Sequence, residues 1–133
     1  MGNNKKVLSG NPSPKRRDNP VTGCPLTAAL AAIGGKWKLI IIYWLAESPK
    51  HFAAIKREMS TISQKVLTQQ LRELEADGII LRKPTGPVPA IVEYSLTEYG
   101  RSVVPLVESV RVWGRGHLEH LEPSAASQKI SNE

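Results

Sequence analysis

The spacing of apolar residues changes at Gly78, and this change limits what the chain can fold into. Over 64–77, QKVLTQQLRELEAD, apolar residues recur every three or four positions, as on a helix with one buried face. Segments 79–83 and 91–96 are rich in β-forming residues, and in 91–96 apolar and polar side chains alternate. The proline-rich turn PTGPVP lies between them. The sequence therefore predicts a helix followed directly by a β-hairpin.

Two shorter helices are predicted upstream. Residues 25–33 begin with a proline and are followed by two glycines, which are typical helix start and stop signals. Residues 51–59, HFAAIKREM, place their apolar side chains on one helical face. Segment 36–47, KWKLIIIYWLAE, stays open on pattern alone, because three consecutive isoleucines favour a buried strand whereas its other apolar residues fit a helical period.

A long helix is expected downstream, from Thr97 to about Leu121, with Pro105 kinking it or separating its first turns. Both ends of the chain are polar, so we expect a disordered basic tail over 1–21 and a flexible tail over 122–133. One domain over 22–121 remains. The 41% hydrophobic content of the 133 residues suffices for its core.

The chain offers no segment for crossing a membrane. Its longest apolar run, 39–46, is far shorter than the roughly 20 residues that a membrane-spanning helix needs. The N-terminus lacks the apolar stretch of a signal peptide. Cys24 is the single cysteine, so no disulfide can form within the chain, which suits a reducing compartment. We therefore expect a cytoplasmic protein without a membrane partner.

Positive charge is concentrated in two parts of the chain, whose net charge is +6. Residues 1–21 carry five Lys or Arg against one acid, and 36–83 carry nine against five acids. Residues 84–121 carry three against four. The basic residues of the folded part thus lie around the helix at 64–77, as expected if this region binds a polyanion. The alternative is that these cations only solvate the surface.

Polar residues are sorted along the helix that begins after its predicted N-cap, Ser63. Acids appear only in the second half, at Glu73, Glu75 and Asp77. The first half presents six polar residues with no acid among them: Ser63, Gln64, Lys65, Thr68, Gln69 and Arg72. Beyond the cap, they fall within an arc of roughly 140° opposite the leucines. Their side-chain types are those that reach base edges and phosphates in a DNA major groove.

These elements together predict a known DNA-binding arrangement. A short helix, a tight turn and the helix at 64–77 make a helix-turn-helix, and the hairpin behind it makes the unit a winged helix. An ordinary amphipathic helix is the alternative for 64–77. The sorted charges and the hairpin favour the helix that reads DNA.

Three long segments resemble the HxlR-type winged-helix regulators of bacteria, relatives of the MarR type. They are 24–45, CPLTAALAAIGGKWKLIIIYWL; 62–80, ISQKVLTQQLRELEADGII; and 92–114, VEYSLTEYGRSVVPLVESVRVWG. The resemblance extends from about Cys24 to His120. It implies that 38–47 is helical and that the fold is mainly α with a small β-hairpin wing, in the α+β class.

The resemblance also implies a homodimer that binds double-stranded DNA at a pseudo-palindromic operator near a promoter. The first and last helices would form the dimer interface, and each protomer would contribute a recognition helix and a wing. Two recognition helices one DNA turn apart, roughly 34 Å, fit such an operator. The expected function is transcriptional regulation, as a repressor more than as an activator.

Individual residues take roles under this resemblance. The groove-reading set would be Ser63, Gln64, Lys65, Thr68, Gln69 and Arg72. Phosphate contacts are expected from Lys36, Lys38 and Lys50, and wing contacts from Arg82 and Lys83. The apolar positions offered to the dimer interface are Leu26, Leu30, Leu106, Val110, Trp113 and Leu121. Packing within the protomer is the alternative for these apolar residues.

Cys24 precedes Pro25, so it is the N-cap if Pro25 opens the first helix. A thiol there faces unpaired N–H groups and the positive end of the helix dipole, which lowers its pKa. The resemblance implies a sensor of oxidants or electrophiles, since some family members use a cysteine at this position. Without a second cysteine, a disulfide would join two protomers; otherwise the thiol would pair with a small thiol or form an adduct. The alternative is a small residue without a sensing role.

No catalytic site is visible in the sequence. There is no convincing nucleophile triad or pair of catalytic carboxylates, and Gly34, Gly35 and Lys36 lack the other residues of a phosphate loop. His117 and His120 more often mark a helix C-terminus than a metal site. We expect no enzymatic activity, cofactor or bound metal. Two alternatives remain: a winged helix that docks protein, and a regulator that binds a small-molecule effector at the dimer interface.

Overall fold

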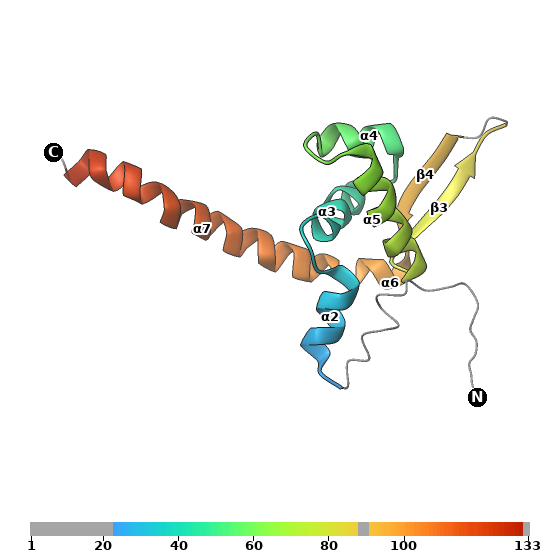
Figure 1. Ribbon diagram of the computed structural model, residues 1–133, viewed down its shortest axis with the longest axis horizontal. Helices are drawn as coiled ribbons and strands as arrows, with labels where there is room; N and C mark the ends of the chain where they lie inside the picture. The colour runs from blue at the N-terminus through green and yellow to red at the C-terminus, as the bar shows by residue number, and fades with distance from the viewer. Residues whose placement is uncertain (1–22, 88–90, 132–133) are drawn as a thin grey trace.

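The computed structural model describes residues 23–87 and 91–131, so the tail predicted over 1–21 lies outside the described residues. Within them the chain forms helices and a small sheet (Figure 1). In chain order the elements are α2 (Pro25–Ile33), α3 (Lys38–Glu47), β2 (Lys50–His51), α4 (Phe52–Glu58), α5 (Gln64–Ala76), β3 (Ile80–Thr85), β4 (Ile91–Leu96), α6 (Glu98–Arg101) and α7 (Val104–Ser131). The predicted class, mainly helical with a β-hairpin, is confirmed.

Helix α2 begins and ends where the sequence predicted. Cys24 is its N-cap, with an extended backbone, and Pro25 is its first residue. The N–H of Gly34 donates to the Leu30 carbonyl oxygen at 2.9 Å. A side chain at Gly34 would collide with that same carbonyl group, so this stop requires glycine.

Segment 38–47, left open by its residue pattern, is helix α3, as the resemblance implied. Ile41, Ile42 and Leu45 are fully buried. The helix packs against α7 on one side and against β4 and α4 on others. Packing on several sides thus outweighs the strand propensity of the isoleucines.

Helices α4 and α5 form the predicted helix-turn-helix. Ser63 caps α5, because its Oγ accepts a hydrogen bond from the Val66 N–H at 3.1 Å. Ile62 and Leu67 on either side of the cap are both buried, as expected for a hydrophobic staple. After α5, Gly78 turns the chain with a φ of +76°, a backbone conformation that favours glycine. The wing follows directly.

The predicted hairpin is confirmed, and a third short strand joins it. The strand order is β2-β4-β3, and both pairs are antiparallel. Strand β2 contains only Lys50 and His51, too few residues for a periodic pattern, and it was not predicted. Its side chains help to hold it, since the Nδ1 atom of His51 lies 3.0 Å from the Val92 carbonyl oxygen.

The predicted last helix is divided near Pro105, as expected. The break falls at 102–103, so Pro105 is the second residue of α7, where a missing N–H is tolerated. Thr97 caps α6 and accepts the Gly100 N–H at 2.8 Å on its Oγ1. The same hydroxyl donates to the Gly78 carbonyl oxygen at 2.7 Å. These bonds fix α6 beside the turn that follows α5.

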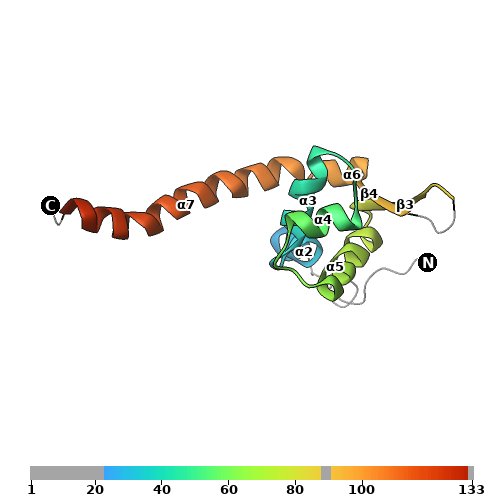
Figure 2. The same cartoon turned by 90° about the horizontal axis from the view of Figure 1, so that it is seen from above.

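Helix α7 extends far beyond the rest of the protein (Figures 1 and 2). Its predicted end at about Leu121 was wrong, because the helix continues to Ser131. Alanine, glutamine and lysine in SAASQKIS, the segment that ends there, have high helix propensities. The tail expected over 122–133 is therefore helical as far as Ser131, whereas its flexibility stays a prediction.

One hydrophobic core lies between the helices and the sheet. Its largest fully buried side chains are Ile41, Ile42, Leu45, Ile55, Ile62, Leu67, Leu71, Leu74, Ile79 and Ile80. Leu67, Leu71 and Leu74 of α5 belong to this core, which orients the opposite face of α5 toward solvent. Within the described ranges no single helix is long and apolar enough to span a membrane. Helices α2 and α3 have the required length and composition only when they are taken together, and the two are bent by 71°.

Candidate nucleic-acid interface

The polar residues at the front of α5 lie together on one face of the helix. A single open depression of about 560 Å³ is lined by Gln64, Lys65, Thr68, Gln69 and Arg72. We call these five residues the groove-reading face. The sixth predicted residue, Ser63, caps the helix in front of them. The structure therefore brings the predicted set together, with the core leucines on the other side of the helix.

Neighbouring residues of a strand point to opposite faces of a sheet, and this separates the two predicted wing contacts. Arg82 is in register with Tyr94 and, together with Arg72, lines a second depression of about 330 Å³ beside α5. Lys83 is in register with Glu93, on the other face of the sheet. The structure thus places Arg82 next to the groove-reading face and Lys83 away from it.

The predicted phosphate contact of Lys38 was wrong. Lys38 is buried at the start of α3, and its Nζ lies 2.7 Å from the Oε1 atom of Glu73 in α5. The two side chains are 5% and 13% exposed, so Lys38 does not reach a phosphate. Lysine is almost never fully buried unless its charge is paired, and Glu73 supplies that pairing.

The other two lysines predicted to bind phosphate differ in accessibility. Lys36 is exposed in the loop before α3, and its Nζ lies 4.7 Å from the centre of the Trp37 ring. Lys50 is half-buried, and its Nζ lies 3.2 Å from both the Oε1 of Glu47 and the Oγ of Ser48. Lys36 is therefore accessible to a phosphate, whereas the charge of Lys50 is already paired.

Two cations next to the groove-reading face received no role from the sequence. Lys56 and Arg57 lie in the last turn of α4. With Gln64 they line a further depression of about 500 Å³, which continues the groove-reading face toward α4. The available signal was the KR pair near the end of HFAAIKREM, directly before the turn. Both side chains suit phosphate contacts that orient a protein on DNA.

Cys24 caps α2, as predicted, and its side chain is exposed. The Thr27 backbone N–H donates to the Cys24 Sγ at 3.4 Å. Hydrogen bonding from Thr27, by its side chain first and then by its backbone N–H, lowers the pKa of the thiol. The structure thus presents an accessible cysteine with an increased thiolate fraction.

A helix-turn-helix with a polar second helix and an arginine of the wing beside it is the arrangement of winged-helix DNA-binding proteins. A sequence profile described as HxlR-like helix-turn-helix matches residues 32–122. This chain belongs to the HxlR-like family. Accordingly, the HxlR-like protein is a helix-turn-helix transcriptional regulator and not an enzyme.

Known relatives of this HxlR-like regulator include bacterial regulators with solved structures. The HTH-type transcriptional regulator YybR of Bacillus subtilis (strain 168) is 47% identical over 100 residues, which are 75% of this chain and 80% of YybR. The redox regulator HypR in its reduced form is 45% identical, with a TM-score of 0.70 over 74% of this chain and 98% of HypR. The reduced form of YodB from B. subtilis is 34% identical, with a TM-score of 0.60 over 68% of this chain and 89% of YodB.

The HxlR-like regulator exposes apolar side chains on α2 and α7. The six residues predicted for a dimer interface are between 43% and 69% exposed. All six are thus well exposed in the protomer, although Val110 also lines a groove against α3. Four of them form what we call the α7 stripe: Leu106, Val110, Trp113 and Leu121. Their contact with a second protomer stays a prediction.

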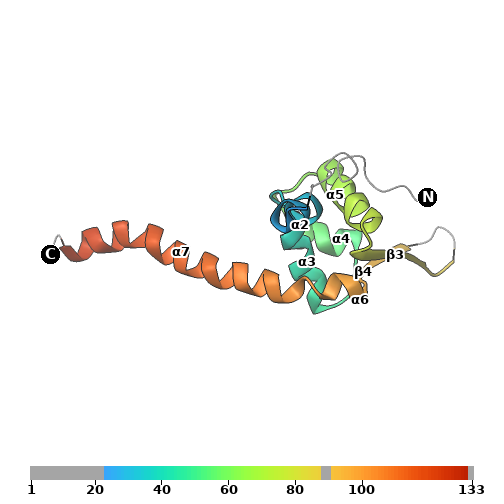
Figure 3. The ribbon, with the colours of Figure 1, turned by 90° about the horizontal axis from the view of Figure 1, so that it is seen from below.

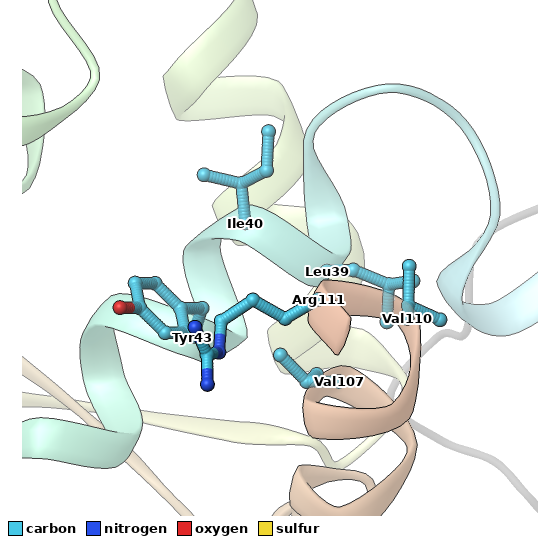
Figure 4. A pocket seen from close by; sticks show the side chains of 6 residues that line it. All are labelled: Leu39, Ile40, Tyr43, Val107, Val110 and Arg111. Carbon is cyan, nitrogen blue, oxygen red and sulfur yellow. The ribbon is translucent and has the colours of Figure 1, made fainter. Parts of the chain in front are cut away.

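The α7 stripe continues into an apolar groove of the HxlR-like regulator, which was not predicted. A cavity of about 320 Å³ between α3 and α7 is lined by Leu39, Ile40, Tyr43, Val107, Val110 and Arg111 (Figure 4). Arg111 is the charged residue at this groove, and its Nη2 lies 3.1 Å from the Oε1 of Glu108. The hydrogen bonds from Arg111 to Glu108 raise the pKa of the guanidinium group.

Both histidines considered for metal binding lie on the exposed part of α7. The His117 ring stacks on Trp113, with ring centres 5.0 Å apart, and the His120 ring is 6.4 Å from that of His117. These rings extend the α7 stripe. In the part of the chain that the structure describes, no three His, Cys, Asp or Glu side chains gather to hold a metal ion.

Proposed function

We propose that this HxlR-like regulator is a cytoplasmic homodimer that binds a pseudo-palindromic DNA operator and represses transcription by covering a promoter. Each protomer would insert the front of α5 into a major groove and place its wing on the adjacent backbone. The observation that carries the proposal is the groove-reading face, where five exposed or half-exposed side chains that can bond to bases or phosphates line one depression without an acid. Arg82, Lys56 and Arg57 beside it supply the charge for phosphate contacts.

The proposed dimer joins two protomers through α7 and α2. The α7 stripe follows one side of a helix, and contiguous apolar patches on a protein surface commonly mark an interface. Figure 3 shows α7 leaving the body on the side away from the wing. A partner bound along α7 therefore leaves the wing free. Two recognition helices held in this way can read two half-sites.

DNA fragments selected with the full-length protein test the proposed operator. We expect the recovered fragments to share an inverted repeat whose half-sites lie one helical turn, or a multiple of it, apart. Binding should weaken steeply with added salt, because phosphate contacts release counterions. Failure to enrich any shared sequence would contradict the proposed function.

Gln64→Ala is expected to weaken binding to the selected DNA by about 1–3 kcal/mol and to leave binding to random DNA unchanged, because Gln64 contacts a base. Arg82→Ala should weaken both to a similar extent, because a phosphate contact carries no sequence information. Fluorescence anisotropy with both DNAs measures the difference. The matched control for Arg82→Ala is Lys83→Ala, on the opposite face of the wing, which should weaken DNA binding less than Arg82→Ala does. If Gln64→Ala weakens binding to both DNAs equally, Gln64 contacts the DNA backbone and not a base.

A thiol-responsive switch is a finer proposal, favoured by the lowered pKa of Cys24. HypR is described as a redox regulator with oxidised and reduced forms, and a YodB structure was solved after diamide treatment. In this chain two Cys24 thiols, one from each protomer, would form a disulfide, and diamide would accept the two electrons and two protons. An electrophile would instead alkylate the Cys24 thiolate directly.

Thr27→Val is expected to slow the alkylation of Cys24 by iodoacetamide at neutral pH by about two- to threefold. Loss of the Thr27 hydroxyl moves the lowered pKa of Cys24 back up, which reduces the thiolate fraction near pH 7. Well above the ordinary cysteine pKa both proteins are fully ionised and should react at similar rates. Mass spectrometry at several pH values measures the rates, with Cys24→Ser as the unreactive control. If the alkylation rates of the two proteins depend on pH in the same way, Thr27 does not cause the lowered pKa of Cys24.

A further inference from the structure

We infer that the buried ion pair of Lys38 and Glu73 fixes the side-chain amide of Gln69 and thereby sets which base Gln69 reads. The inference rests on the proposed function, in which Gln69 contacts a base. Lys38 and Glu73 are positioning residues in this arrangement. They act on DNA recognition through Gln69 and not by touching DNA.

The three side chains form a chain of contacts from α3 to the groove-reading face. The Nζ of Lys38 lies 2.7 Å from one carboxylate oxygen of Glu73, Oε1. The other oxygen, Oε2, accepts a hydrogen bond from the Nε2 of Gln69 at 3.3 Å. Lys38 and Glu73 are 5% and 13% exposed, whereas Gln69 is exposed. A buried charge is thus connected to an amide on the surface.

The charge of Glu73 decides which end of the Gln69 amide faces inward. An ionised carboxylate accepts hydrogen bonds and donates none, so it binds the NH2 group of Gln69 and not its carbonyl oxygen. The ion pair with the Lys38 ammonium group requires this ionised form. Rotation of the amide by 180° would bring two oxygens together and is therefore disfavoured.

The outward edge of Gln69 then has a defined hydrogen-bonding pattern. It presents the carbonyl oxygen Oε1 as an acceptor and the second N–H as a donor. An acceptor beside a donor complements the N6 amino group and N7 of adenine in the major groove. Gln69 is therefore expected to select an A·T pair, and holding the amide in place before binding reduces the ordering required on DNA.

Gln64 provides an internal comparison five residues earlier, about one and a half turns along the same helix. It lies on the same groove-reading face. Among the described residues its side chain makes no hydrogen bond, so none of them fixes its amide. If the side-chain amide of Gln69 is less mobile than that of Gln64, the difference therefore reports on the contact between Gln69 and Glu73.

Nuclear magnetic resonance of the full-length protein without DNA tests the positioning step by itself. The side-chain NH2 of Gln69 should have a higher ¹⁵N order parameter than that of Gln64. In the double variant Lys38→Met/Glu73→Leu the two should become similar. Equal order parameters in the unaltered protein would overturn the inference, whatever the double variant does.

A second measurement tests the consequence for DNA reading. The double variant replaces a buried ion pair with apolar side chains of similar size, a change that often leaves the fold intact, and thermal unfolding checks this. Discrimination here means the ratio of affinities for DNA with the preferred base pair and DNA with another base pair at the same position. At the position where Gln69→Ala lowers this ratio, the double variant should lower it on the order of tenfold. Adding Gln69→Ala to the double variant should reduce discrimination at that base pair by less than Gln69→Ala does in the unaltered protein. Discrimination at the base pair read by Gln64 should be unchanged.

The outcomes separate this inference from the proposed function. A folded double variant that keeps full discrimination at the Gln69 base pair would overturn the inference and leave the proposed function standing. An unaltered protein that prefers no DNA sequence would overturn the proposed function. In that case an ordered Gln69 amide would still support the positioning by Lys38 and Glu73.

Discussion

Replacing Trp113 with glutamate is expected to convert the proposed dimer into a monomer. Trp113 is 69% exposed within the α7 stripe, and each protomer would bring one new carboxylate to the interface. Burying a charge without a partner in an apolar contact is strongly unfavourable. Operator affinity should fall on the order of a hundredfold or more, because a monomer engages one half-site at a time. Sedimentation velocity and fluorescence anisotropy measure the two effects.

Val112→Glu is the matched control for this substitution. Val112 is exposed on the same helix, one residue from Trp113 and hence roughly 100° around its axis. The same charge is added to the same element, but away from the α7 stripe. The Val112→Glu protein should stay dimeric and bind the operator normally. If Trp113→Glu also sediments as a dimer, the α7 stripe is not the interface.

Lys38→Ala is expected to lower the free energy of unfolding by about 3–5 kcal/mol, a large fraction of the stability of a domain of this size. The substitution leaves the carboxylate of Glu73 13% exposed and without the ammonium group that lies 2.7 Å from it. It also removes the long alkyl chain of a buried lysine. Urea denaturation at pH 7 measures the change.

Two variants show whether the loss of stability comes from breaking the ion pair between Lys38 and Glu73. Lys36→Ala removes an exposed lysine two residues before Lys38, in the loop that precedes α3, and should change stability by less than about 0.5 kcal/mol. Lys38→Met/Glu73→Leu removes both charges and should recover most of the stability lost in Lys38→Ala. If Lys38→Ala is as stable as Lys36→Ala, the ion pair does not hold α3 against α5.

Local signals were sufficient to predict the recognition helix. The N-cap at Ser63, the buried leucines and the sorted polar residues all follow rules that act within one helix, so α5 and the common face of its polar residues were predicted correctly, whereas their contact with DNA stays a prediction. The pattern of α3 was not sufficient, because three isoleucines fit a strand as well as a buried helix. Only the resemblance to a known family decided that segment.

Roles that depend on contacts between distant segments could not be predicted. Nothing in the sequence around Lys38 indicates that Glu73, in another helix, pairs with it and draws it into the core. The separation of Arg82 from Lys83 was accessible in principle, since alternate strand residues face opposite ways. Which face lies beside α5 follows from the register with Tyr94, and hence from the folded sheet.

In the proposed dimer, the length of α7 would couple folding of the chain to its assembly. Beyond its start on α3, the helix extends away from the protomer (Figure 1), and an isolated helix of a few turns is only marginally stable in water. A partner that covers the α7 stripe would therefore also stabilise the helix itself, and stability would rise with protein concentration. The number of regulator molecules in the cell would then itself affect how much of the protein is folded and dimeric. In the proposed dimer, the recognition helices would act singly at low copy number, and occupancy of the proposed operator would rise more steeply than the protein concentration.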